Sequence, residues 1–344
     1  MKVTLKSLCT RFSSGDRIDS KKISEKGKYP VFGGNGIRGY SDIYNFNGRC
    51  AIIGRQGANC GNVKYFDGKA YMTEHAVVVE SNNTNDIGYL SCKMKLMDLG
   101  KYQGQSAQPG LSVKIISELK VEVPNLETQQ KIWNIIDKLN GKIENNCKIN
   151  NNLEELAYTM YLHDFANKIP NGCIGDIILE NKKSAIKVGE AKDKKGEYPF
   201  FTSGDSILEW NDFLVNGRNL FLNTGGNAGV KFYVGKAMYS TDTWCITTEK
   251  YSDYLYFYFK LINKDLDRKF FHGSGLKHLQ KPLLKQEQIY IPSEDEINKF
   301  NSKVQSMFDT ISSNTLENKK LIELKAFLLP MLMNGQINVD DIEI

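Results

Sequence analysis

Two short patterns in the sequence could hold catalytic or cofactor-binding groups. Phe32-Gly33-Gly34-Asn35-Gly36 matches Phe-x-Gly-x-Gly, the arrangement that cradles S-adenosylmethionine in DNA methyltransferases. A glycine loop of this kind opens a helix, whose N-terminal amides help to hold the ligand. Residues 37–42 are poor helix formers, and the related stretch 201–205 lacks the glycine spacing. We therefore interpret the pattern as a turn between two strands.

Other catalytic patterns are equally incomplete. Glu118-Leu119-Lys120 and Glu323-Leu324-Lys325 are Glu-x-Lys fragments, but no Pro-Asp precedes either one, as a nuclease site would require. The chain has no Pro-Pro-Tyr element for holding a flipped base and no phosphate-binding Gly-Lys-Ser/Thr loop. The sequence thus predicts no catalytic centre and no cofactor in this chain. A stand-alone DNA methyltransferase stays open as the enzymatic alternative.

The cysteines and histidines predict neither a metal site nor a disulfide framework. Seven cysteines and four histidines are scattered, and no two cysteines form Cys-x-x-Cys. The first eight residues are interrupted by lysines, and no apolar run approaches the ~18 residues of a membrane span. We therefore expect a reduced, cytoplasmic protein.

The sequence patterns that would form the helices and strands around any site occur twice in the chain. Four short patterns recur 167 to 169 residues later, and this offset is close to half of the 344 residues. The recurrences are Tyr29-Pro30 with Tyr198-Pro199, Asn47-Gly48-Arg49 with Asn216-Gly217-Arg218, Gly68-Lys69-Ala70 with Gly235-Lys236-Ala237, and Val123-Pro124 with Ile291-Pro292. A constant offset over four matches indicates an internal duplication.

Each half begins with short alternating apolar runs between Gly- and Asn-rich turns, which is typical of β-strands. Short helices are expected near 86–97 and 252–262, and an X-Pro boundary then precedes a long helix, which in the first half covers 127–163. Apolar positions in both long helices alternate steps of four and three, the seam of a coiled coil. The seams hold Ile132, Ile136, Leu139, Ile143, Asn146, Asn150, Leu153, Ala157 and Met160, and Phe300, Val304, Met307, Ile311, Asn314, Asn318, Leu321, Lys325 and Leu328.

The polar pair Asn146/Asn150 recurs as Asn314/Asn318 in the middle of the second seam. Buried asparagines lower the stability of a seam and fix its register. Antiparallel helices would bring the four side chains together, and so would a parallel dimer of two chains. The duplication favours the antiparallel arrangement within one chain.

Charge separates the strand-rich regions from the helices. Residues 1–122 have a net charge of +7 and residues 166–292 of +4, whereas 123–165 and 293–344 have −2 and −4. Two basic blocks suit contact with a polyanion such as nucleic acid. A tandem-repeat structural protein or a carbohydrate-binding protein would explain the strands and the coiled coil, but it would leave this charge distribution unexplained. Another DNA-binding tandem-repeat protein stays open as an alternative.

These features together resemble the specificity subunit of a type I restriction–modification system. The matching motifs are Leu153-Glu154-Glu155-Leu156-Ala157 followed by Tyr161, the helix end 327–336, and the loops 104–112 and 273–279. The resemblance implies an α+β fold with two pseudo-two-fold-related target-recognition domains of mixed β-structure with short helices, separated by two long helices in an antiparallel coiled coil. The expected boundaries are 1–124 and 166–292 for the recognition domains and 125–165 and 293–344 for the helical repeats.

The resemblance also implies partners. This chain would bind double-stranded DNA and two DNA methyltransferase (modification) subunits that use S-adenosylmethionine. Two restriction (motor-nuclease) subunits would use ATP and magnesium. DNA would be read as a bipartite, asymmetric target, since the loops of the two halves differ in sequence.

Polar side chains near the glycine-rich loops are the candidate DNA-binding residues, because amide and charged groups read base edges and hold phosphates. In the first half they are Asn35, Arg38, Arg55, Gln56, Asn59, Lys64, Gln105, Ser106 and Gln108. In the second half they are Ser203, Asp205, Asn223, Thr224, Asn227, Lys231, Lys277 and His278.

Overall fold

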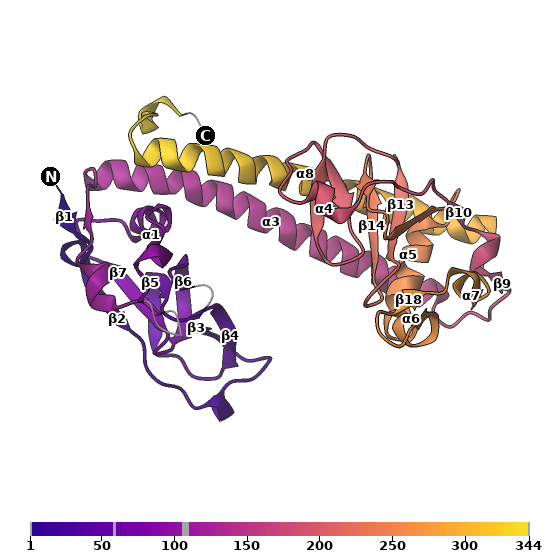
Figure 1. Ribbon diagram of the computed structural model, residues 1–344, viewed down its shortest axis with the longest axis horizontal. Coiled ribbons are helices and arrows are strands. Elements are labelled where there is room, and N and C mark those ends of the chain that lie inside the picture. The colour runs from indigo at the N-terminus through magenta and orange to yellow at the C-terminus, as the bar shows by residue number, and fades with distance from the viewer. Residues whose placement is uncertain (1, 58–59, 105–109, 343–344) are drawn as a thin grey trace. The chain divides into compact units, whose positions relative to one another are not determined.

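The computed structural model describes residues 2–57, 60–104 and 110–342. The chain divides into two compact units (Figure 1). Unit 1 takes its residues from 1–143 and 320–344, and unit 2 is 144–319. Each unit therefore combines a strand-rich region with parts of both long helices, and the predicted α+β class is confirmed.

The elements of unit 1 follow one another in short steps. Its strands are β1 (Val3–Thr4), β2 (Cys9–Ser14), β3 (Tyr29–Gly33), β4 (Gly36–Ser41), β5 (Phe46–Gly54), β6 (Val63–Met72), β7 (Ala76–Ser81) and β8 (Lys120–Val121). Its short helices are α1 (Ile87–Leu96) and α2 (Val113–Ser117), with 3-10 turns η1 (Leu5–Leu8), η2 (Ser20–Lys22), η3 (Leu99–Tyr102) and η5 (Val339–Asp341).

Unit 2 has a similar order. Its strands are β9 (Gly172–Cys173), β10 (Leu179–Glu180), β11 (Tyr198–Phe201), β12 (Ile207–Trp210), β13 (Arg218–Asn223), β14 (Val230–Val234), β15 (Met238–Tyr239), β16 (Thr243–Thr247), β17 (Phe271–His272), β18 (His278–Leu279) and β19 (Gln288–Ile289). Its short helices are α4 (Val188–Ala191), α5 (Ser252–Leu261), α6 (Asn263–Phe270) and α7 (Lys281–Lys285), with the 3-10 turn η4 (Ile174–Asp176). The long helices are α3 (Leu126–Phe165) and α8 (Glu294–Met333).

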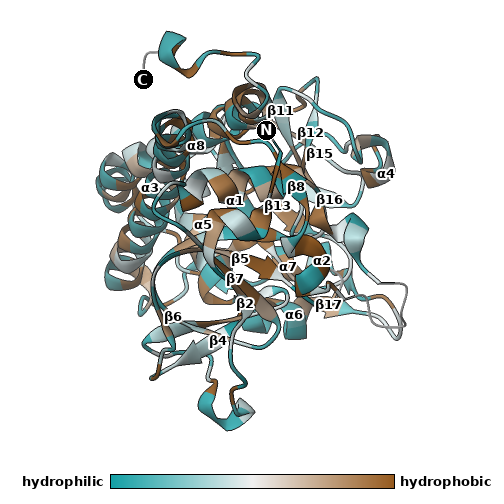
Figure 2. Ribbon diagram, turned by 90° about the vertical axis from the view of Figure 1, so that its left-hand side faces the viewer, coloured by the Kyte–Doolittle hydropathy of each residue, from teal (hydrophilic) through white to brown (hydrophobic). Residues whose placement is uncertain are grey.

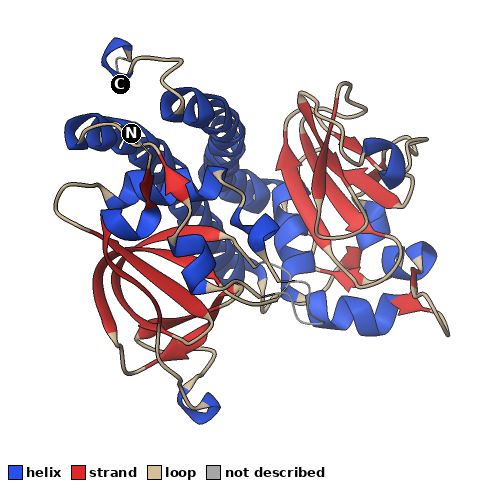
Figure 3. Cartoon of the chain, turned by 60° about the vertical axis from the view of Figure 1, so that its left-hand side comes forward, coloured by secondary structure: helices blue, strands red, loops and turns tan. Residues whose placement is uncertain are grey.

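The main sheet of unit 1 has six strands in the order β2-β7-β5-β6-β3-β4, curved as Figure 3 shows. The pair β3 and β6 is parallel, and the other pairs are antiparallel. In β5, Ala51 and Ile53 face the core that contains α1, while Cys50 and Ile52 face a second core on the other side of the sheet. This period of two is the alternation expected of a strand buried on both faces.

Unit 2 repeats the arrangement in two smaller sheets, with the orders β10-β16-β13-β14 and β12-β11-β15. The parallel pair β11 and β15 aligns Phe201 with Tyr239, as β3 and β6 align Phe32 with Met72. Leu220 of β13 faces the core that contains α5, and its neighbour Phe221 faces the opposite one. The predicted short helices near 86–97 and 252–262 are confirmed as α1 and α5.

Both long helices begin at the X-Pro boundaries that the sequence marks. The Asn125 side chain accepts from the Thr128 N–H at 2.9 Å, which caps the start of α3. At the start of α8, the Glu296 carboxylate accepts from the Ser293 N–H at 2.9 Å and the Ser293 hydroxyl accepts from the Glu296 N–H at 3.4 Å, a capping box. Each cap satisfies amide groups that have no partner within the helix.

The two helices run antiparallel, as predicted. In unit 1 the beginning of α3, with Ile132 and Ile136, packs into the same core as the end of α8, with Leu329 and Leu332. In unit 2 the end of α3 packs into the core that contains Phe300 and Val304 from the beginning of α8. Both long helices contain hydrophobic as well as hydrophilic residues (Figure 2).

The asparagines of the two seams bond to one another within unit 2. The Asn146 amide donates to Asn318 Oδ1 at 3.0 Å, and the Asn314 amide donates to Asn150 Oδ1 at 2.8 Å. Asn146 is 1% exposed. A polar pair at this depth is satisfied only when the helices lie in one register, so it disfavours a shifted alignment.

Candidate nucleic-acid interface

In each unit, a backbone hydrogen bond at the same position of the repeat joins two loops, and a third loop, β3–β4 or β11–β12, lies against them. In unit 1 the Leu111 N–H donates to the Arg55 carbonyl at 2.9 Å, which joins the β5–β6 connection to the loop before α2. In unit 2 the Leu279 N–H donates to the Thr224 carbonyl at 3.0 Å. Isolated bridges between Gln56 and Gly110 and between Gly225 and His278 extend the two contacts. The duplication has thus kept a backbone junction in loops whose side chains differ.

A second backbone contact fixes each junction to the sheet. The Arg55 N–H donates to the His75 carbonyl at 2.9 Å, and the Thr224 N–H donates to the Asp242 carbonyl at 3.3 Å. Because both contacts join backbone atoms, the side chains at these positions can vary without loss of the junction.

The β3–β4 connection of unit 1 is the turn predicted for Phe-x-Gly-x-Gly. Gly33 pairs with Gly36 across the turn, and β4 follows directly rather than a helix. Asn35 is exposed at the tip of the turn. A Cβ atom on Gly34 would lie 2.7 Å from the Gln56 carbonyl oxygen, so this turn lies against the β5–β6 connection.

The structure describes five of the candidate DNA-binding residues of unit 1. Asn35, Arg38, Gln56 and Lys64 are exposed, although Arg38 and Lys64 lie on strands that border the loops rather than in them. Arg55 is half-buried, and its Nε donates to the Leu111 carbonyl at 3.3 Å. The remaining candidates, Asn59, Gln105, Ser106 and Gln108, lie outside the described residues.

In unit 2, four candidates form an internal network. The Ser203 hydroxyl oxygen accepts from the Thr224 N–H at 2.9 Å. The Lys231 ammonium donates to the Thr202 carbonyl at 3.0 Å and to Asn223 Oδ1 at 3.2 Å. Burial lowers the pKa of Lys231, with a smaller opposing contribution from Asp205. Ser203, Asn223 and Lys231 therefore stabilise the shape of the loops.

The other candidates of unit 2 face solvent. Asp205, Asn227, Lys277 and His278 are exposed, and Lys277 forms an ion pair with Asp267 at 2.7 Å. Asn227 lies at the tip of the β13–β14 connection, and His278 lies on β18, one residue before the junction bond of Leu279. These four side chains are therefore accessible to solvent, unlike those of the internal network.

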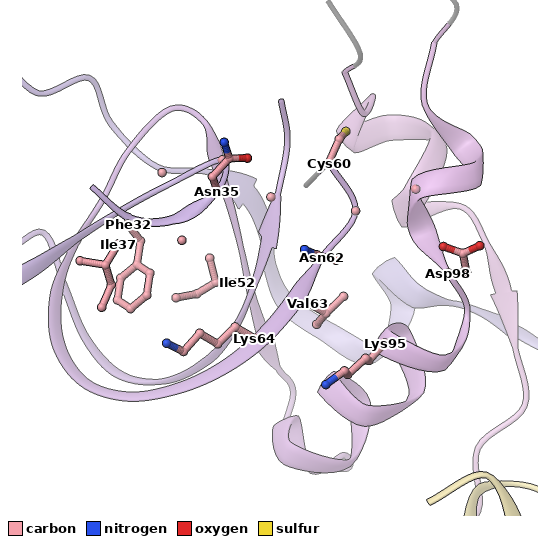
Figure 4. A pocket seen from close by; sticks show the side chains of 16 residues that line it. Phe32, Asn35, Ile37, Ile52, Cys60, Asn62, Val63, Lys64, Lys95 and Asp98 are labelled. Atoms are coloured by element: carbon pink, nitrogen blue, oxygen red, sulfur yellow. The ribbon is translucent and has the colours of Figure 1, made fainter. Parts of the chain in front are cut away.

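Three polar residues that border the loops of unit 1 are not among the candidates predicted from the sequence. Asn62, Lys95 and Asp98 line a hollow of about 600 Å³ together with residues of β3, β5 and β6 (Figure 4). Lys95 and Asp98 come from the end of α1 and the residues after it, far in sequence from the glycine-rich loops. No local pattern marks them.

Neither metal ligands nor a membrane segment was found in the part of the chain that the structure describes. Within residues 2–57, 60–104 and 110–342, no three His, Cys, Asp or Glu side chains are grouped as a metal site. None of the helices in these ranges combines the length and the hydropathy that crossing a membrane requires.

The family model of the type I restriction modification DNA specificity domain matches residues 1–155 and 169–326. These two matches cover most of the chain, and the chain belongs to this family. The two matched ranges correspond to the two halves of the internal duplication, so the chain contains two specificity domains.

Individual relatives agree with this assignment. The EcoprrI specificity subunit of Escherichia coli is 38% identical over 162 residues, which span 43% of this chain and 40% of that relative. The MjaIX specificity subunit of Methanocaldococcus jannaschii is 22% identical over 304 residues, 74% of this chain and 70% of that relative. The crystal structure of a type I restriction–modification S subunit from M. genitalium shares the fold, with a TM-score of 0.70, 15% identity and coverage of 96% and 95% of the two chains.

Proposed function

We propose that this chain reads DNA sequence for a type I restriction–modification complex, with the three loops of each unit contacting one half of a bipartite target. The observation that carries the proposal is the repeated junction, in which Leu111 bonds to Arg55 and Leu279 bonds to Thr224. The same backbone arrangement therefore presents one set of side chains in unit 1 and a different set in unit 2. The two half-sites should therefore differ in sequence.

The charges around the loops support DNA as the ligand. Arg38, Lys64 and Lys95 are exposed, and none has an ion pair with an acidic group in the described ranges. The Lys64 ammonium lies 5.5 Å from the centre of the Phe32 ring, a contact that leaves its charge uncompensated. Cations without an acidic partner suit a surface on which lysines and arginines hold phosphates while amides reach base edges.

The chemistry would come from partner subunits. Two methyltransferase subunits with S-adenosylmethionine and two motor-nuclease subunits with ATP and magnesium would dock on this chain. Leu156 on α3 and Leu324 on α8 are 47% and 44% exposed and occupy equivalent positions of the repeat, and Phe327 is 59% exposed. Equivalent apolar residues on the two helices suit two copies of one partner, and we assign them to the modification subunits.

Selection from a random duplex library with the purified full-length chain tests the proposal. We expect enrichment of two short, different sequences separated by an unread gap. Affinity for the selected duplex should fall steeply as salt concentration rises, because bound phosphates release counterions. The chain alone should neither methylate nor cleave the duplex. Enrichment of no sequence, or methyl transfer above a background control, would contradict the proposal.

A further inference from the structure

The β11–β12 connection of unit 2 corresponds to the β3–β4 turn of unit 1, but the two differ in charge. Asp205 lies in the β11–β12 connection, and its side chain is exposed. The β3–β4 turn consists of Gly34 and Asn35, which carry no charge. A carboxylate is therefore present in one unit at a loop where the other unit has none.

Hydrogen bonds hold this connection of unit 2 against the β13–β14 connection. The Ser203 hydroxyl oxygen accepts from the Thr224 N–H at 2.9 Å. Within the β11–β12 connection, the Thr202 hydroxyl donates to the Ser206 carbonyl at 2.6 Å. Asp205 therefore belongs to a turn that is fixed beside the backbone junction of unit 2.

The Asp205 carboxylate has no ion pair and accepts no hydrogen bond within residues 2–57, 60–104 and 110–342. The Lys231 ammonium donates instead to the Thr202 carbonyl at 3.0 Å and to Asn223 Oδ1 at 3.2 Å. The exposed Lys277 already has an ion pair with another carboxylate. The charge of Asp205 is thus left for a ligand to satisfy.

An unpaired carboxylate disfavours DNA unless the DNA supplies a hydrogen-bond donor. A duplex has one negative charge per ~1.7 Å of its axis, so it repels an ionised carboxylate in the interface. An ionised carboxylate accepts hydrogen bonds and donates none. Asp205 can therefore favour a bound duplex only where a donor group of a base faces it.

Few groups of a duplex can donate to a carboxylate. In the major groove the donors are the amino groups N4 of cytosine and N6 of adenine, whereas guanine and thymine present acceptors. In adenine the acceptor N7 lies beside N6 and repels a carboxylate, but cytosine has a C–H group beside N4. Cytosine is therefore the base that a carboxylate selects.

We propose that Asp205 reads a cytosine in the half-site that unit 2 contacts, by accepting a hydrogen bond from the N4 amino group. The inference rests on the proposed function and deepens it, because it names one base of one half-site. The β3–β4 turn of unit 1 imposes no such requirement on the other half-site, since Gly34 and Asn35 are uncharged.

A cytosine analogue tests the contact. Selection with the full-length chain supplies the duplex, and His278→Ala identifies the half-site of unit 2, because His278 is exposed beside the junction of that unit. Each cytosine of this half-site is then replaced in turn by 2-pyrimidinone, which lacks the amino group. At one position we expect the parent chain to lose about tenfold in affinity, whereas Asp205→Ala should bind the two duplexes alike.

Two results would overturn the proposal. The parent chain could bind every substituted duplex as tightly as the selected one, or Asp205→Ala could lose as much affinity as the parent. If no sequence were selected at all, the proposed function would fail instead.

The variant should also have opposite effects on two duplexes. Asp205→Ala should bind the selected duplex about tenfold more weakly than the parent does, and should bind more tightly a duplex with thymine in place of that cytosine, because the repulsion is removed. Glu249→Gln, an exposed change beyond the far end of β16, is the matched control and should alter neither affinity. Weaker binding of both duplexes by Asp205→Ala, with an unchanged circular dichroism spectrum, would contradict the proposal.

Asp242 is a second exposed carboxylate near the junction, since its carbonyl accepts from the Thr224 N–H at 3.3 Å. Asp242→Asn should preserve the response to 2-pyrimidinone. Loss of the response in Asp242→Asn but not in Asp205→Ala would assign the cytosine to Asp242 and refute the assignment to Asp205.

A minor-groove contact would use a different donor, the N2 amino group of guanine. Inosine, which lacks this group, is therefore placed at each guanine of the half-site in turn. The effect of Asp205→Ala on affinity should stay the same. If that effect disappeared with inosine, Asp205 would read guanine and the cytosine assignment would be wrong.

Discussion

The Arg218 guanidinium donates to the Asp253 carboxylate over 2.6 Å and so fastens β13 to the start of α5. A second nitrogen of Arg218 donates to the Gln305 carbonyl at 2.9 Å, and the same nitrogen pairs with Asp309. Arg218 therefore joins the central strand of unit 2 to α5 and α8. This role gives a physical reason for the arginine in the recurring Asn-Gly-Arg pattern of the second half.

The stability of unit 2 should depend on pH through Asp253. Burial raises the pKa of Asp253 to about 6, although Arg218 opposes the shift. Between pH ~4 and ~6 the folded state then binds more protons than the unfolded state, so the free energy of unfolding falls as pH rises. The contribution of this group should be ~2 kcal/mol smaller at pH 7 than at pH 4. Asp253→Asn should remove that part of the pH dependence.

Urea unfolding followed by tryptophan fluorescence measures this effect. In a Trp133→Phe background, Trp210 and Trp244 both report on unit 2. Asp309→Asn is the control, because Asp309 is 60% exposed and bonds to the same arginine. If the difference in unfolding free energy between the parent and Asp253→Asn were constant with pH, Asp253 would not titrate as described.

Loop substitutions should separate the two half-sites. Gln56→Ala should weaken reading of one half-site by ~1–3 kcal/mol and leave the other unchanged, because Gln56 is exposed in the loops of unit 1. Asn227→Ala and His278→Ala should have the converse effect. Competition against duplexes mutated in one half-site at a time measures both. Equal loss at both half-sites from either set would contradict the two-reader arrangement.

Replacing both members of an asparagine pair should lower the free energy of unfolding by less than the sum of the two single replacements. Asn146→Leu and Asn318→Leu should each destabilise unit 2 by ~1–2 kcal/mol, because each breaks the 3.0 Å bond in a buried seam. The double variant should recover part of this loss through apolar packing. A double-mutant cycle measured by urea unfolding checks the coupling, and strict additivity would show that the bond contributes nothing.

Equal insertions into both long helices should lengthen the unread gap in the target. Each helix has 40 residues and contributes residues to both units. A heptad inserted at corresponding positions preserves the seam and adds ~10 Å, about three base pairs. Selection over duplexes of varied gap length should yield a longer optimum with unchanged half-site sequences. An optimum that stayed in place would show that the helices do not set the spacing.

The helices were the most predictable part of the molecule. Their seams and the X-Pro boundaries are local in sequence, and the expected helix over 127–163 is present as Leu126–Phe165. The loops were less predictable, since the junction bond of unit 1 joins Arg55 to Leu111, 56 residues away. The inward position of Lys231 and the hollow lined by Lys95 depend on such distant contacts. The composition of a loop shows which of its residues are polar, but it does not show which of these side chains point into the protein and which face solvent.

The asparagine bonds also bear on how a chain of this kind could arise. Asn146 bonds to Asn318 and Asn314 bonds to Asn150, while the repeat equates Asn146 with Asn314 and Asn150 with Asn318. Each bond thus joins the first position of one repeat to the second position of the other. Two identical half-length chains would make the same pair of bonds with each other. Gene fusion of such a homodimer would preserve both asparagine bonds while freeing each half to acquire a different DNA preference.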